Sequence, residues 1–469
     1  MSGRQDGSGS RRVAVIGGGL AGLAAAVRLV QHGGQVTVFE ARRHLGGRAG
    51  SFLDPESGEW LDHCQHVAMG CCTEWESLCH ETDMDALFRT DRVLHFFGTD
   101  RRYYQLAAST WLPAPYHLLP GLLRLGYLSI VERWGILRTL HRLRGMKDSD
   151  SACQLVLGAW LLDQRQTGHA IEHFWSVVIL SALSESVDRV SVRAARQVFV
   201  DGFMATRRSF ELHVPIVPLS ELYDQHLANW LRSRGARIHL EHPIRQLTGD
   251  AKGVTSLRLA DGTSHAFEEY VLAVPWWCVR RVMSEDLQRA LPAVSAAEQL
   301  ESSSITAVHL WFDRPITSLP HAVLVGGTAQ WVFRGVVPSE PMGGSPRTHH
   351  EHYYQVVISA SQLVAAADRS EIVARVCADL AVLGDQVATA RLLRWRVVEQ
   401  PRAVFAPLPG SDAMRPQALS PVPNLSLAGD WTATGWPATM ESAVRSGNRA
   451  AACVLERASI TNREMGPVR

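Results

Sequence analysis

Residues 12–40 read RVAVIGGGLAGLAAAVRLVQHGGQVTVFE, and this stretch decides the fold. A short run of β-branched residues leads into a glycine cluster, an Ala- and Leu-rich segment of helical character follows, and a second strand-like run lies at 35–39. A strand, a helix and a second strand in this order form a β-α-β unit. The sequence therefore predicts an α/β fold.

The glycines of this unit are spaced for a dinucleotide. Gly17, Gly19 and Gly22 have G-x-G-x-x-G spacing, with Gly18 between the first two. A tight turn, a close approach of backbone to a pyrophosphate and close helix packing each require a missing side chain. The phosphates would lie at the helix N-terminus. Glu40, at the end of the second strand, is placed to bind a ribose hydroxyl, so we predict a Rossmann-type dinucleotide site.

A second glycine turn follows Glu40 directly. Gly46, Gly47 and Arg48 lie within ARRHLGGRAGSF, residues 41–52. Because this glycine-arginine turn follows the first glycine motif and Glu40, the sequence resembles the FAD-binding amine oxidase and carotenoid desaturase superfamily. The resemblance implies that FAD is the cofactor and that Arg48 lies near its phosphates. A solvated loop arginine is the alternative interpretation of Arg48.

The C-terminal region carries a third element of the same kind. Residues 425–451, LSLAGDWTATGWPATMESAVRSGNRAA, read as a strand, a loop and a helix that begins near Pro437. This region is similar to the closing FAD motif of the superfamily, which implies that Asp430 contacts the ribityl-phosphate region. The helix start would direct N–H groups at the flavin pyrimidine and stabilise negative charge on a reduced flavin. The cofactor residues implied here are Gly429, Asp430, Pro437, Ala438, Thr439 and Met440.

Composition and charge narrow the class of protein. The chain has 469 residues, of which 46% are hydrophobic and 20% charged, with a formal net charge of +1. This length favours two joined domains, and the balanced charge does not favour nucleic acid. The polar start of the chain lacks the apolar region of a signal peptide, and no apolar run is long enough for a spanning helix. We therefore expect a cytoplasmic protein with reduced thiols. Peripheral association with the inner face of the cell membrane is a separate expectation, which rests on residues 111–145.

The cofactor domain is expected to be discontinuous. A middle segment resembles the corresponding part of the superfamily, with Ile244 near the adenosine end of the cofactor. An interleaved α+β substrate-binding domain, of the amine oxidase and phytoene desaturase type, would be formed by the remainder. The predicted FAD-binding segments are 12–84, 211–280 and 416–457, the substrate-binding segments are 85–210 and 281–415, residues 1–11 form a flexible N-terminus, and residues 458–469 form a tail.

Residues 111–145, WLPAPYHLLPGLLRLGYLSIVERWGILRTLHRLRG, are apolar at helical spacing. Tryptophans and tyrosines lie among the leucines, and basic residues gather toward the C-terminal end. One interpretation is a helix of the substrate domain packed on its core. The other is an interfacial element that rests in a membrane surface and admits a lipid.

Residues 61–72, LDHCQHVAMGCC, crowd histidines and cysteines into one stretch. The spacing is not that of a structural zinc site, and adjacent Cys71 and Cys72 lack the C-x-x-C arrangement of a redox pair, so we predict no metal. Buried thiols in a helix are the simplest interpretation of Cys71, Cys72 and Cys79. The superfamily resemblance places this stretch beside the flavin ring. Asp62, Cys64 and His66 are therefore the candidate catalytic residues.

Four strings resemble one family within the superfamily, the hydroxysqualene dehydroxylases of bacterial squalene and hopanoid biosynthesis. They are DHCQHVAMGCC at 62–72, SSITAVHLWFDRPI at 303–316, TAQWVF at 328–333, and GDWTATGWPATMESAVRSG at 429–447. His63 departs from the family pattern, in which a small amide is expected. The family reaction removes the allylic hydroxyl of hydroxysqualene and leaves squalene, with a long-chain isoprenoid as substrate.

This reaction sets chemical requirements. Reduced FAD would deliver hydride from N5 to carbon, an acid would protonate the departing oxygen, and a dry pocket would protect the allylic cation. His66 is our hypothesis for the acid because histidine titrates near neutral pH, while Asp62 would need a raised pKa or would only orient a turn. Aromatic residues are candidates for the hydrocarbon channel, although core packing explains them as well: Trp311, Phe312, Trp331 and Phe333.

Alternatives stay open at this point. A carotenoid-type desaturase would use the same cofactor with hydride flowing from a polyisoprenoid to FAD. An amine oxidase is less favoured, because the substrate half is lipid-like. A non-catalytic lipid-binding escort protein, as in Rab escort-type proteins, shares the fold, although retention of Glu40, Arg48 and Asp430 argues against it. The sequence contains no second dinucleotide motif, so an external reductant or a partner reductase is expected to reduce the FAD.

Overall fold

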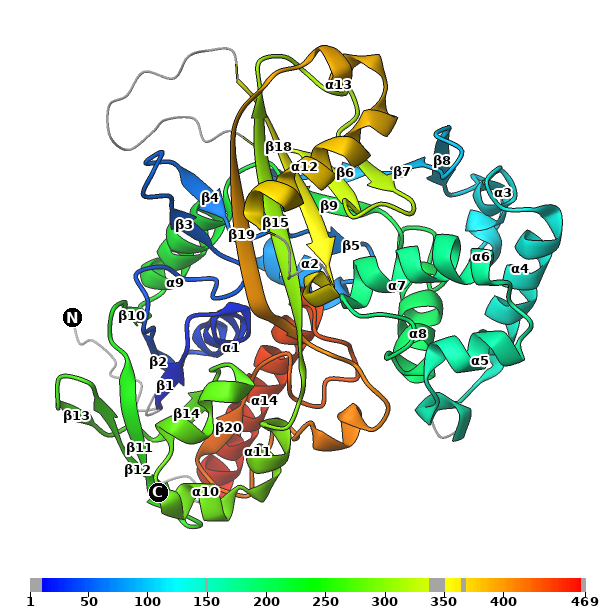
Figure 1. Ribbon diagram of the computed structural model, residues 1–469. Coiled ribbons are helices and arrows are strands. Elements are labelled where there is room, and N and C mark those ends of the chain that lie inside the picture. The colour runs from blue at the N-terminus through cyan, green and yellow to red at the C-terminus, as the bar shows by residue number, and fades with distance from the viewer. Residues whose placement is uncertain (1–10, 148–150, 337–350, 364–367, 465–469) are drawn as a thin grey trace.

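A computed structural model describes residues 11–147, 151–336, 351–363 and 368–464. Its centre is a parallel five-stranded sheet in the order β10-β2-β1-β14-β20. The strands come from distant parts of the chain, as Figure 1 shows. Their bounds are β1 Arg12–Ile16, β2 Gln35–Phe39, β10 Arg237–His239, β14 Glu269–Leu272 and β20 Leu425–Leu427. The predicted β-α-β unit and α/β fold are confirmed.

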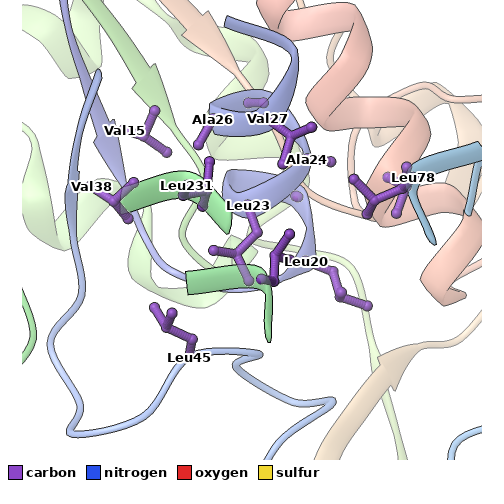
Figure 2. Close-up of a cluster of buried hydrophobic side chains, with 14 of the residues drawn as sticks. Val15, Leu20, Leu23, Ala24, Ala26, Val27, Val38, Leu45, Leu78 and Leu231 are labelled. Carbon is purple, nitrogen blue, oxygen red and sulfur yellow. The ribbon is translucent and has the colours of Figure 1, made fainter. Parts of the chain in front are cut away.

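Helix α1 (Leu20–Gln31) is buried between this sheet and helix α14 (Met440–Glu464). Its alanines and leucines are apolar on nearly all sides, which suits a helix covered on both faces. Figure 2 shows Leu20, Leu23 and Val27 within the cluster that fixes α1. A Cβ atom at Gly447 of α14 would lie 2.2 Å from the carbonyl oxygen of Ala21, so glycine permits this close helix contact.

A second, seven-stranded sheet has the order β19-β15-β18-β17-β16-β7-β8. Only the pairing of β16 with β7 is parallel among the pairings described. Helix α12 (Arg369–Leu380) packs its apolar side on one face of this sheet. The bounds are β7 Val93–Phe97, β8 Tyr103–Ala107, β15 Ser302–Phe312, β16 His321–Leu324, β17 Trp331–Arg334, β18 His352–Ser359, β19 Leu392–Phe405 and α13 Asp385–Thr389.

A lobe of helices lies beside the second sheet, at the right of Figure 1. The predicted helical segment 111–145 is not one helix, because it divides into η2 (Tyr116–Leu118), α3 (Leu119–Leu123) and α4 (Ile130–Gly145). Helix α4 begins with a capping box between Ser129 and Glu132, which stops it from extending back toward α3. The other elements of the lobe are η3 Ser151–Gln154, α5 Leu157–Asp163, α6 Gly168–Ala170, η4 Ile171–Trp175, α7 Ser176–Leu183, α8 Val192–Arg196 and η5 Gln197–Phe203.

Short sheets and helices connect these parts. Strands β5 (Ala68–Met69) and β6 (Phe88–Asp91) flank β9 (Leu212–Pro215), so residues on both sides of the predicted boundary at 84 share one sheet. The remaining elements are β3 Ser51–Leu53, β4 Trp60–Asp62, α2 Thr73–Glu81, η1 Asp85–Leu87, η6 Glu221–Leu227, α9 Ala228–Ser233, β11 Ile244–Asp250, β12 Gly253–Leu259, β13 Ser264–His265, η7 Trp276–Cys278, η8 Arg280–Val282, α10 Glu285–Ala290, α11 Pro292–Ala297, η9 Ser361–Leu363, η10 Ala381–Leu383 and η11 Ser411–Met414.

The predicted segments of the cofactor domain supply all five strands of the parallel sheet. Packing on that sheet continues beyond residue 280, since α10 and α11 bury Leu287 and Val294 in the same cluster as Ile16. Helix α14 runs through Glu464, so residues 458–464 are helical rather than a separate tail. Residues 1–10 of the predicted N-terminal lead and 465–469 of the tail lie outside the described residues. The domain boundaries themselves stay a prediction.

Within the described ranges, no helix combines the length and the apolar character needed to cross a bilayer.

Candidate active site

The first glycine turn has the geometry that a bound pyrophosphate requires. Gly17 has a φ of +110°, in the region that favours glycine. A Cβ atom at Gly22 would lie 1.9 Å from the carbonyl oxygen of Gly17, which leaves no room for a side chain. Gly17 and Gly22 therefore each have a structural reason, and the turn brings the backbone of β1 directly to the N-terminus of α1.

The N-terminus of α1 is open and uncapped. No side chain caps it at Gly19, and its first turn has no acidic residue. A Cβ atom at Gly19 would have Gly47 Cα, 4.0 Å away, as its nearest neighbour, and Gly19 forms a backbone bridge with Gly46. The two glycine turns therefore enclose free N–H groups and open space, an arrangement that fits an anionic pyrophosphate.

Glu40 is buried and held by backbone amides. Its Oε2 accepts from the N–H of Gly18 at 2.6 Å, and its Oε1 accepts from the N–H of Arg42 at 2.8 Å. The N–H of His242 donates to the Glu40 carbonyl, two residues before Ile244 opens β11. The predicted ribose carboxylate and the predicted adenosine-end residue therefore lie in the same region.

Arg48 is an ion-pair partner rather than a solvated loop residue. Its Nη2 donates to Asp430 Oδ1 at 2.5 Å, and its Nη1 donates to the carbonyl of Ala403 at 2.9 Å. The guanidinium also lies 5.5 Å from the ring centroid of Trp276. The second glycine turn is thereby fixed to the C-terminal motif.

The C-terminal motif forms as the sequence predicts, with a later helix start. Gly429 has a φ of +141° and precedes the buried Asp430. Helix α14 begins at Met440, so Pro437 and Ala438 belong to the preceding loop. The hydroxyl of Thr439 accepts from the N–H of Ser442 at 3.2 Å, as an N-cap residue does.

Asp62 organises the turn in front of η6. Its Oδ1 accepts from the hydroxyl of Ser51 at 2.6 Å and from the N–H of Leu219 at 3.1 Å. The hydroxyl of Ser51 in turn accepts from the N–H of Ser220 at 2.8 Å. Burial raises the pKa of Asp62 to about 6, against the opposing effect of these hydrogen bonds. A carboxyl with this pKa is partly protonated at mildly acidic pH.

The neighbours of Asp62 differ in what they can do. Burial raises the pKa of the Cys64 thiol to about 12, so this residue is a protonated space-filling thiol and not a nucleophile. His66 donates through Nδ1 to the carbonyl of Cys64 at 2.9 Å. Burial lowers the pKa of His66, the hydrogen bond to Cys64 opposes this, and the charge of Arg48 adds to the lowering. His66 is therefore neutral at pH 7, with Nε2 as an acceptor, and must take up a proton before it acts as an acid.

The cysteine stretch is only partly helical. Cys79 is buried within α2, whereas Cys71 and Cys72 precede that helix and are half-buried. The helical interpretation of Cys71 and Cys72 is therefore wrong, because the helix begins only at Thr73. No disulfide joins the eight cysteines, all of which lie in the described part of the chain. That part also contains no cluster of three metal-ligating side chains.

An apolar cavity of about 460 Å³ lies between the second sheet and the helical lobe. Gln65 lies in its wall, two residues after His63, whose N–H donates to the carbonyl of Gly50 at 3.0 Å, just beyond the second glycine turn. This end of the cavity is therefore next to the cofactor residues. The amide of Gln65 makes one long contact, 3.5 Å to the carbonyl of His66. Other lining residues include Val67, Met69, Phe96, Leu106, Leu122, Phe174, Phe203 and Val357.

The structure assigns the four predicted channel aromatics to two places. Trp331 and Phe333 line the cavity, and Trp331 Nε1 donates across to the hydroxyl of Ser181 in α7 at 2.7 Å. Trp311 instead packs beside Tyr353 under the guanidinium of Arg394, and Phe312 is buried under α12. Neither of these two residues lines this cavity, and a place for them in a substrate channel stays a prediction. Adjacent residues of a strand point to opposite faces, and neither face reaches the cavity at this point of β15.

Gln65 is a site residue that the sequence analysis missed. It lies between Cys64 and His66, in the loop between β4 and β5. Gln65, Val67 and Met69 of this segment line the cavity, whereas His66 is not part of its wall. This alternation was the available signal, although the sequence alone does not say which of the two sides is the cavity.

The flavin containing amine oxidoreductase family model matches residues 20–455. The chain belongs to this family. It is an FAD-dependent oxidoreductase, and the two glycine turns, Glu40 and the Arg48–Asp430 pair hold the features that FAD binding needs. The chain is 26% identical over 451 residues to a hydroxysqualene dehydroxylase of Zymomonas mobilis, covering 94% of this chain and 98% of the relative.

Other members of the family are also similar. A zeta-carotene desaturase of Synechocystis is 22% identical over 476 residues, covering 95% of this chain and 97% of the relative.

 A solved structure of putrescine oxidase superposes with a TM-score of 0.70 at 16% identity, covering 95% of this chain and 99% of that one. This likeness shows the fold alone.

Proposed function

We propose that this flavoenzyme removes the allylic hydroxyl of hydroxysqualene and leaves squalene, in squalene and hopanoid biosynthesis. The observation that carries the proposal is the apolar cavity, with Gln65 as a polar group at the end next to the cofactor residues. A long hydrocarbon with one hydroxyl fits such a cavity. The similarity to relatives named hydroxysqualene dehydroxylase supports the same substrate.

The reaction balances as a two-electron reduction. A hydride forms the new C–H bond, the allylic C–O bond breaks, and the oxygen leaves as water after taking up one proton. FAD, when bound in its reduced form, supplies the hydride, and an external reductant restores that form. The chain's own residues must bind the substrate, exclude bulk water and provide the proton.

The cavity wall meets the first two requirements. Apolar side chains from both the sheet and the helical lobe keep water away from a developing allylic cation. The rings of Trp331 and Phe333 lie in that wall, where aromatic faces attract positive charge. The amide of Gln65, which makes only one long contact, is available to donate to the substrate hydroxyl and hold it at the cofactor end.

His66 is the proposed source of the proton, with Asp62 as the second candidate. The carbonyl of Cys64 holds the His66 ring in place and favours its protonated form. Asp62 is protonated more readily than an ordinary aspartate, although its Oδ1 is occupied by Ser51 and Leu219. We therefore assign proton delivery to His66 and orientation of the turn to Asp62.

A carotenoid-type desaturase is the second candidate function. Similarity to a zeta-carotene desaturase over most of both chains favours it, and an apolar cavity suits a polyene equally well. In that reaction hydride leaves the substrate, no oxygen is lost and no acid is required. A lipid escort role without catalysis is disfavoured, because the chain retains Glu40, Arg48 and Asp430 in a connected arrangement.

Product analysis separates these functions. The purified holoenzyme is incubated with hydroxysqualene and a chemical reductant, and in parallel its oxidised form is incubated with phytoene or zeta-carotene. Extracted lipids are analysed by gas or liquid chromatography with mass spectrometry. Squalene in the first reaction alone supports the dehydroxylase. A desaturated polyene in the second reaction alone supports the desaturase.

A further inference from the structure

The exposed apolar side chains of the protein are concentrated in one segment. Fifteen large apolar residues are exposed in the described structure, and six of them lie between positions 111 and 134. The four most exposed are Trp111 at 85%, Val131 at 78%, Ile130 at 70% and Trp134 at 64%. Exposed apolar patches of this kind mark interaction sites.

Three of these four side chains lie close together at the start of α4. Ile130 and Val131 lie in the first turn of α4, and Trp134 lies one turn further along, at i+4 from Ile130 and i+3 from Val131. Arg133 donates to the carbonyl of Leu123 at 2.6 Å, which fixes the end of α3 beside the start of α4. Figure 1 shows α3 and α4 at the outer edge of the helical lobe.

The apolar cavity opens within this patch. Tyr116 and Trp134 both line the cavity, and both are more than half exposed, at 52% and 64%. Side chains that are exposed and also line a cavity form its mouth. The wall continues inward through Leu119, Leu122 and Leu137. A mainly apolar wall therefore continues from the patch into the cavity.

The charge around the patch favours an anionic surface. Residues 111–147 contain six basic residues, Arg124, Arg133, Arg138, Arg142, Arg144 and Lys147, and one acid, Glu132. Glu132 is used within the fold, where it accepts from Ser129 and from Thr167. Arg124 is exposed beside the patch, and Arg144 lies at the cavity wall. Basic residues next to exposed tryptophans suit anionic lipid headgroups.

We propose that residues 111–144 form a docking surface for an anionic lipid bilayer. The 16-residue α4 lies on the membrane, and Trp111, Ile130, Val131 and Trp134 enter its interface. The cavity mouth then faces the acyl chains, so a lipid passes from the bilayer to the cavity without entering water. A protein partner would also cover apolar residues, but a protein would block the mouth. Docking stands independently of the proposed function, whereas substrate entry rests on it.

Vesicle binding tests the docking surface directly. The full-length holoenzyme is sedimented with phosphatidylcholine vesicles and with vesicles that contain 30% phosphatidylglycerol. We expect binding to the anionic vesicles and at least tenfold weaker binding to the neutral ones. An Ile130→Glu/Val131→Glu variant should lose anionic binding at least tenfold. A Leu419→Glu variant is the matched control, because Leu419 is 62% exposed and lies far along the chain from the patch.

Activity assays with the substrate supplied in two forms, in detergent and in vesicles, test whether the lipid enters the cavity from the bilayer. With hydroxysqualene dispersed in detergent, the Ile130→Glu/Val131→Glu variant should match the wild type, since neither residue lines the cavity. With hydroxysqualene in anionic vesicles, its turnover should fall at least tenfold. If no condition yields squalene, the proposed function fails while the binding result stands. The docking proposal is overturned if the wild-type protein does not bind anionic vesicles, or if the variant binds them as well as the wild type. It is also overturned if the protein binds no vesicles and instead forms a dimer that the variant disrupts.

Discussion

Arg48 Nη2 and Asp430 Oδ1 lie 2.5 Å apart, although the two residues are separated by 382 positions in the chain. The pair connects the second glycine turn with the C-terminal motif, the two regions that the superfamily resemblance assigns to FAD. The Asp430 side chain is 4% exposed, so its charge depends on this partner.

Replacing Arg48 by leucine should therefore cost both stability and flavin. Leaving Asp430 buried without its partner costs about 3 kcal/mol, and the flavin-to-protein absorbance ratio should fall at least tenfold after dialysis. Thermal unfolding and absorbance spectra measure the two effects. Arg43→Ala is the control, because its pair with Glu241 is exposed and should matter to neither property. A flavin-loaded Arg48→Leu protein of normal stability would contradict the assignment.

Gly19 and Gly22 should respond differently to alanine. At Gly19 an added methyl has no neighbour closer than 4.0 Å and fills the space in front of α1, so Gly19→Ala should keep its fold and lose flavin. At Gly22 the methyl would lie 1.9 Å from the Gly17 carbonyl oxygen, so Gly22→Ala should lower the melting temperature as well. Melting temperature and flavin content are compared for both variants. Normal flavin occupancy in Gly19→Ala would place the cofactor elsewhere.

Asp62→Asn should stabilise the protein in a pH-dependent way. The pKa of Asp62 is about 6 in the folded protein, above the ordinary 3.8, so folding favours the protonated carboxyl. Stability from this group is present below pH 4 and is lost as the pH rises through 6. The asparagine variant escapes this loss, which amounts to about 3 kcal/mol at pH 8. Melting curves from pH 4 to 8 measure the difference, and a difference independent of pH would refute the burial argument.

His66 should control the pH dependence of turnover. Burial lowers its pKa, so the protonated form becomes more abundant only as the pH falls below 6.5. Single turnovers with pre-reduced enzyme should therefore accelerate as the pH is lowered through this range. His66→Gln should remove the acceleration and slow turnover at least tenfold, whereas Asp62→Asn should retain the pH dependence. Full turnover by His66→Gln would eliminate this residue as the donor.

The cofactor half of the protein was predictable because its signals are local. Gly17, Gly19 and Gly22 specify a turn whose spacing and backbone geometry follow from missing side chains, and the flanking strands lie in adjacent sequence. The ion pair between Arg48 and Asp430 was not predicted, although both residues were assigned to the cofactor. Their contact depends on the path of the chain between them.

The substrate half was harder to predict because its cavity is assembled from distant segments. Trp331 and Phe333 share one face of β17, and this face meets the helical lobe, whereas Trp311 and Phe312 lie where β15 is covered on both faces. The alternation of a strand shows which residues share a face, but not what covers that face. For the same reason, the sequence did not show that Gln65, rather than its neighbour His66, lies in the cavity wall.

One measurement tests the central claim most directly. The holoenzyme is photoreduced without oxygen and mixed with one equivalent of hydroxysqualene, while flavin absorbance is followed and lipids are extracted. The proposed dehydroxylation predicts flavin reoxidation matched by one squalene per flavin. Persistence of reduced flavin with unchanged hydroxysqualene, together with desaturation of a polyene by the oxidised enzyme, would contradict it and assign the cavity to a desaturase.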